Sequence, residues 1–97
     1  MRLIQLDEME KEATLFKQIF EEFAEEAERM EDVYGRRLSV QEYNRAIETA
    51  IHSAGKLDKQ RKIVIEGIFD TYIGALFNSG HDAAKLFADK IISKTSA

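Results

Sequence analysis

The residues that could do chemistry are a dense set of carboxylates in the first third of the chain. They recur at helical steps along one side of an expected helix: Glu21, Glu22, Glu25, Glu26, Glu28 and Asp32. Such a set could form a metal or acid/base site, a solvated face, or an acidic surface for a basic partner. Nothing in the sequence buries these groups against apolar residues, which a catalytic carboxylate needs. We therefore interpret them as an exposed acidic face, which is either only solvated or binds a basic partner.

Neither histidine has the neighbours of a metal or catalytic site. His52 follows Glu48 by four residues, and the Glu-x-x-His element of carboxylate-bridged metal proteins is absent. The chain contains no cysteine, and no serine stands at a diagnostic distance from a histidine. Gly55-Lys56 lacks the upstream glycine and the following hydroxyl residue of a phosphate-binding loop. The sequence thus predicts a protein without enzymatic activity, cofactor or metal.

A set of basic residues surrounds two expected turns: Arg36, Arg37, Lys56, Lys59, Arg61 and Lys62. Basic residues at a helix–turn–helix could bind DNA phosphates. The helix after the second turn is apolar, however, whereas a recognition helix presents polar side chains to the groove. Arg61 also stands near a position where such motifs carry a core aliphatic residue. Nucleic acid is therefore not the partner that we favour.

Length and composition predict one helical domain covering residues 1–97. Hydrophobic residues make up 44% and charged residues 33%, and there is no proline to break helices. Residues 1–34 contain eleven acidic and four basic residues, against seven and ten in the remainder. This asymmetry favours either internal pairing or a basic partner. No stretch is apolar enough to cross a membrane and none resembles a secretory signal, so we expect a cytoplasmic location without a membrane partner.

The first expected helix, about Glu8 to Tyr34, carries an apolar seam at heptad spacing. Its members are Met9, Ala13, Phe16, Phe20, Phe23, Ala27, Met30 and Tyr34. Asp7 with Glu10 predicts a capping box at its start, and Gly35 predicts its end. At roughly 40 Å it exceeds every other expected helix. We therefore predict a homodimer or higher homo-oligomer formed through Met9, Phe16, Phe20, Phe23, Met30 and Tyr34.

Two capping signals set the starts of the next helices. Ser39 with Glu42 has the spacing of a capping box, and this second helix is expected to reach about Ala54 before Gly55. Asp58 is expected to cap the third helix, which continues to Phe77.

The third expected helix is apolar around most of its circumference, with ten apolar residues among positions 63–77. Neighbouring helices should therefore enclose it. Small or short residues follow one line along it, Gly67, Thr71, Gly74 and Asn78, which predicts a close helix crossing. Ser79 and Asp82 are expected to cap a fourth helix.

These patterns predict an all-α, four-helix bundle-like domain with a long first helix and a buried third helix. The function that we favour is a self-associating, non-enzymatic protein-binding or regulatory module. The alternative is an acidic inhibitor that mimics nucleic-acid charge, of the type that mobile elements such as phages use. A DNA-binding regulator is the third interpretation.

Overall fold

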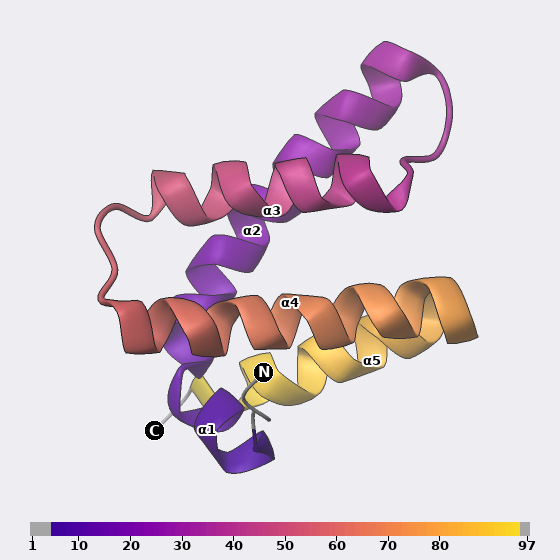
Figure 1. Ribbon diagram of the computed structural model, residues 1–97. Helices are drawn as coiled ribbons and strands as arrows, with labels where there is room; N and C mark the ends of the chain where they lie inside the picture. Colours follow the sequence, from indigo (N-terminus) through magenta and orange to yellow (C-terminus); the bar gives the residue numbers. More distant parts are fainter. Residues whose placement is uncertain (1–4, 96–97) are drawn as a thin grey trace. The chain divides into compact units, whose positions relative to one another are not determined.

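The computed structural model of the protein describes residues 5–95. These residues form five α-helices and one short 3-10 helix and contain no strand, which confirms the predicted all-α class (Figure 1). The elements are α1 (Leu6–Lys11), α2 (Ala13–Tyr34), α3 (Val40–Ser53), α4 (Lys59–Ser79), α5 (His81–Ile92) and η1 (Ser93–Thr95). None of the helices within the described residues is long and apolar enough to span a bilayer.

The elements group into two compact units. The terminal unit contains the described residues up to Lys17 and from Leu57 onward, and so holds α1, the start of α2, α4, α5 and η1. The central unit, Gln18–Lys56, holds the rest of α2 and all of α3. That residues 1–97 make one domain stays a prediction.

In the terminal unit, α4 and α5 lie side by side and run in opposite directions (Figure 1). Its core is apolar and includes Phe16, Ile65, Ile68, Phe69 and Ile91, each at most 1% exposed. The rings of Phe16 and Phe69 lie 5.1 Å apart at an interplanar angle of 58°. Full burial of side chains of this size contributes about 1.5–3 kcal/mol each, so this cluster dominates the stability of the unit.

The apolar α4 is buried on one side only. Val64, Ile65, Ile68, Phe69, Tyr72 and Ile73 are buried. Glu66 and Asp70 are exposed, and Phe77 is 49% exposed. The predicted burial of this helix is therefore correct for one face of α4, whereas the prediction that neighbouring helices enclose it around its circumference is wrong.

Gly80 alone separates α4 from α5. It has φ +98° and ψ 175°, a conformation that is essentially restricted to glycine. Asn78 and Ser79 are still part of α4, so the predicted end of α4 at Phe77 and the predicted cap by Ser79 are wrong. The break needs one residue rather than three because Gly80 turns the chain without strain.

The predicted close helix crossing at Gly74 is also wrong. A Cβ atom at Gly74 would meet no other atom within 4 Å. About one turn before Gly74, on the same side of α4, the Thr71 hydroxyl donates a hydrogen bond of 3.1 Å to the Gly67 carbonyl oxygen. This hydrogen bond is local to α4, and Gly74 lies beside open space.

The expected continuous helix from Glu8 to Tyr34 is broken at Glu12 into α1 and α2, so there are five α-helices rather than four. Glu12 has φ −100° and ψ 18°, and its carboxylate accepts hydrogen bonds from Arg61 of α4 at 3.0–3.2 Å. Gln5, not Asp7, is the N-cap of α1, and its backbone N–H donates to the Glu8 carboxylate at 3.5 Å. Asp7 lies inside the first turn, where a carboxylate suits the helix dipole.

The starts of α3 and α4 and the ends of α2 and α3 lie where the sequence predicted them. Ser39 is the N-cap of α3, and its side chain accepts a hydrogen bond from the backbone N–H of Glu42. Gly35 and Gly55 have φ +68° and +94° and terminate α2 and α3 as predicted. The inward residues of α3, Ala46, Ile47, Ala50 and Ile51, are buried. Asp58 caps α4 by accepting from the backbone N–H of Arg61 at 2.9 Å.

Candidate functional site: an acidic notch between α2 and α3

The six carboxylates identified from the sequence lie along α2 within the central unit. Five of them are exposed, and the side chain of Glu26 is 24% exposed. None lies against the apolar core, because the core side of α2 carries Ile19, Phe23, Ala27 and Met30 instead. The six residues therefore form a negatively charged surface on the outer side of the helix.

Part of this surface is hollowed where α2 meets α3. The hollow, here called the acidic notch, has a volume of about 230 Å³ and is lined by Glu22, Glu25, Glu26, Arg29, Thr49, Ala50 and Ser53. Typical small-molecule pockets measure roughly 300–1,000 Å³, so the notch has room for a single side chain. The structure brings three of the six predicted carboxylates into it, while Glu21, Glu28 and Asp32 are not among its lining residues.

One carboxylate of the notch already has a cationic partner. Arg29 donates to both carboxylate oxygens of Glu26, from Nε at 3.1 Å and from Nη2 at 2.7 Å. These hydrogen bonds stabilise the charged form and lower the pKa of Glu26 below its ordinary value. Among the described residues, Glu22 and Glu25 have no ion-pair partner. The notch therefore offers two carboxylates that are available to an incoming cation.

Sequence reasoning missed the α3 side of the notch. Thr49 and Ser53 stand on the exposed side of α3, where short polar residues leave room for a neighbouring side chain. The four-residue step between them was a signal that they share a face. Only the packing of α3 against α2 reveals that this face borders the carboxylates.

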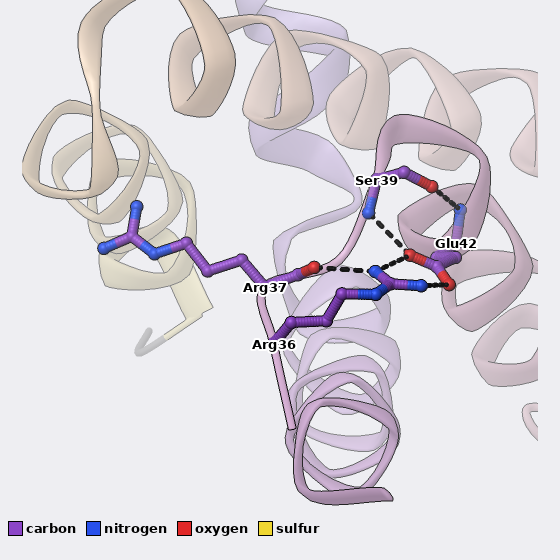
Figure 2. A network of polar contacts seen from close by, with 4 residues as sticks. All are labelled: Arg36, Arg37, Ser39 and Glu42. Carbon is purple, nitrogen blue, oxygen red and sulfur yellow. Dashed lines mark hydrogen bonds and ion pairs between the residues drawn. The ribbon is translucent and has the colours of Figure 1, made fainter. Parts of the chain in front are cut away.

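The turn between α2 and α3 carries a network of polar contacts (Figure 2). Arg36 donates to both carboxylate oxygens of Glu42 at 2.8 Å and to the carbonyl oxygen of Arg37 at 2.9 Å. The backbone N–H of Ser39 also donates to Glu42 at 2.8 Å. The Arg36 guanidinium, followed by this backbone donor, lowers the pKa of Glu42 to about 2. The network fixes the start of α3 rather than forming a binding site.

Some of the basic residues considered for DNA binding form ion pairs within the chain. The guanidinium of Arg36 is held by Glu42, and that of Arg61 is held by Glu12. The side chain of Arg37 points away from the network in Figure 2 and is exposed. Lys56, Lys59 and Lys62 are exposed. Two of the six basic residues thus neutralise carboxylates of the same chain.

The two histidines lie on the surface, and neither is grouped with other ligands. His52 and His81 are both exposed. Within residues 5–95 no group of three or more histidines and carboxylates is arranged to hold a metal ion.

The seam residues expected to mediate self-association are mostly buried within one chain. Met9, Phe16, Phe23 and Met30 are at most 7% exposed, as are Ala13 and Ala27 of the same seam. Phe20 is half-buried, with its ring 5.7 Å from that of Phe23. Tyr34 is 43% exposed, and the Arg36 guanidinium lies 5.1 Å from its ring centroid. Most of the predicted seam is therefore covered within one chain, and Phe20 and Tyr34 are its partly exposed members.

Comparison of the chain with protein-family models, with curated proteins and with solved structures finds no match.

Proposed function

We propose that this chain is a non-enzymatic protein-binding module whose acidic notch receives a lysine or arginine side chain of a basic partner protein. The observation that supports this proposal is the pair of unpartnered carboxylates, Glu22 and Glu25, at the rim of a hollow sized for one side chain. The remaining α2 carboxylates would attract positive charge around the contact and raise the rate of association.

The geometry of the notch suits a long basic side chain. The methyl group of the buried Ala50 offers an apolar contact for the aliphatic stem of such a residue. Thr49 and Ser53 add hydroxyl groups that can accept hydrogen bonds from an ammonium or guanidinium group. An incoming arginine could also compete with Arg29 for Glu26, since solvent-exposed ion pairs contribute little to stability.

Three polar side chains at helix starts have a structural role, so we propose the notch rather than these residues as the binding site. Ser39, Glu42 and Asp58 satisfy backbone groups at helix starts, so their hydrogen-bonding capacity serves the fold. A cytoplasmic location belongs to the same proposal, because a chain without cysteine suits a reducing compartment.

Charge reversal at the notch tests this proposal. In a pull-down from the source cell, Glu22→Lys with Glu25→Lys should lose a partner that the parent chain retains. Glu66→Lys with Asp70→Lys is the matched control, because it changes the net charge equally at two exposed carboxylates of α4. The control should keep the partner. Equal loss in both variants would show that only net charge matters and would reject the notch as the binding site.

Salt and nucleic-acid competition separate this proposal from its alternatives. The captured complex should weaken as ionic strength rises from about 0.1 to about 1 M, because the Debye length falls from about 10 to about 3 Å. A complex held by an apolar groove would barely respond. If the partner binds nucleic acid and duplex DNA displaces this chain, the charge-mimicking inhibitor is supported instead.

We also propose self-association, through exposed apolar residues rather than through the buried part of the seam. Large apolar side chains exposed by at least 43% occur on several elements: Leu6, Val33, Tyr34, Val40, Phe77 and Leu86. They are candidate contacts for a homodimer or higher oligomer. Light scattering coupled to size exclusion measures this directly, and a monomer at tens of micromolar would count against stable self-association.

A further inference from the structure

The junction between α1 and α2 departs from helical geometry at a single residue. The backbone N–H of Glu12 donates to Met9 O, three residues back, instead of to the residue four back. A regular helical hydrogen bond then runs from Phe16 N to Glu12 O at 2.8 Å. The apolar spacing of Met9, Ala13 and Phe16 continues across the break without a shift. The sequence is thus compatible with an unbroken helix through residue 12.

Half of the six residues of α1 are exposed. Met9 is its one buried residue, and Leu6 is 43% exposed. Its ion pair, from Glu10 to Lys94 of η1, is long at 3.9 Å and exposed to solvent. At the junction, Arg61 donates three hydrogen bonds to the Glu12 carboxylate, whose side chain is 18% exposed. An exposed ion pair such as that of Glu10 contributes little, and Met9 is the one buried side chain that anchors α1 in the terminal unit.

We propose that α1 exchanges between two copies of the chain, which then form a domain-swapped dimer. Straightening at Glu12 would join α1 and α2 into one helix of roughly 44 Å, at 1.5 Å per residue. This movement removes α1 from its own α4 and α5 and leaves Met9 in water. A second copy of the chain is the natural acceptor, because each copy carries both α1 and the surface that α1 leaves.

The balance between the two forms depends on concentration. The docked contacts of α1 are the same whether the acceptor belongs to its own chain or to another. The swapped form gains regular helical hydrogen bonding at residue 12. It loses translational and rotational freedom, because two separate molecules become one dimer. The closed monomer therefore dominates in dilute solution, and exchange increases when the protein is concentrated or refolded at high concentration.

Cross-linking between two single-cysteine variants tests the exchange, because the natural chain has no cysteine. Glu10→Cys and Lys94→Cys chains are mixed, unfolded, refolded together at high concentration and treated with a short bis-maleimide. A swapped dimer places residue 10 of one chain beside residue 94 of the other, so a product of twice the chain mass is expected. The doubly substituted chain in dilute solution should cross-link within itself.

A control distinguishes exchange from random collision. Asp70→Cys, an exposed position on α4, is mixed with Lys94→Cys under the same conditions. This pair should give several-fold less double-mass product. Equal yields from both mixtures would overturn the proposal, as would a mixture of Glu10→Cys and Lys94→Cys that stays monomeric while the doubly substituted chain cross-links.

The junction residue gives a second and independent test. Glu12→Ala and Glu12→Gly both remove the contact with Arg61, but alanine favours a continuous helix and glycine opposes it. The dimer fraction measured by light scattering should be several-fold higher for Glu12→Ala than for Glu12→Gly. Equal or reversed fractions would show that straightening at residue 12 does not control association.

Discussion

Phe16 and Phe69 pack against each other in the core of the terminal unit, with ring centroids 5.1 Å apart and planes tilted by 58°. Both rings are at most 1% exposed. Aromatic pairs at this centroid distance contribute about 0.5–1.5 kcal/mol beyond the burial of the two side chains. The pair therefore connects the start of α2 to the middle of α4.

Truncation of this pair is the first prediction. Phe16→Ala should lower the free energy of unfolding by about 3–5 kcal/mol, because it leaves a cavity in the most buried part of the unit. Urea denaturation followed by circular dichroism measures the change. Phe77→Ala is the control in the same unit, since Phe77 is 49% exposed. It should be markedly less destabilising, and similar losses from the two variants would argue against the Phe16–Phe69 core.

The second prediction concerns the pH dependence of the α2–α3 turn. The folded pKa of Glu42 is about 2, against an ordinary value of 4.5, because Arg36 and the Ser39 backbone stabilise its charged form. A depressed folded pKa means that the stabilisation is present above pH 4.5 and is lost as the pH falls through about 2. Glu42→Gln should therefore lower Tm at neutral pH, and its difference from the parent should narrow between these two pH values.

Two measurements check this behaviour. A carbon-detected NMR titration of Glu42 should give a midpoint near pH 2 in the folded chain. Thermal unfolding of Glu48→Gln provides the control, since Glu48 is exposed on the same helix and outside the cap. Its Tm should stay close to that of the parent. A constant gap between the parent and Glu42→Gln down to pH 2 would exclude the ion pair as the source of the stability.

The third prediction compares two glycines of the terminal unit. Gly74 lies inside α4, has helical geometry and has open space where a Cβ would be, so Gly74→Ala should stabilise the chain by about 0.5–1 kcal/mol. Gly80 has φ +98° and ψ 175°, so Gly80→Ala should destabilise it by about 1–3 kcal/mol. Urea denaturation measures both. Destabilisation by Gly74→Ala would instead support the close helix crossing that was predicted from the sequence.

Much of the local structure could be predicted because the interactions that set it lie within a few residues of one another. The cap of α3 by Ser39 and Glu42 is a contact across three residues, and so is the cap of α4 by Asp58. Gly35 and Gly55 end helices through their own backbone freedom. The apolar positions of α3 follow from helical periodicity alone. The six carboxylates of α2 could be assigned to an exposed surface by the same reasoning.

Other features depended on residues far apart in the sequence, and only the tertiary structure decided them. The break at Glu12 coincides with a contact to Arg61, 49 positions away, which no local pattern encodes. Gly74 lies beside open space because no helix crosses there, although its spacing from Gly67 permits a crossing. The acidic notch exists because α3 brings Thr49 and Ser53 beside Glu22 and Glu25. Periodicity defines which side chains share a face, whereas packing determines what that face meets.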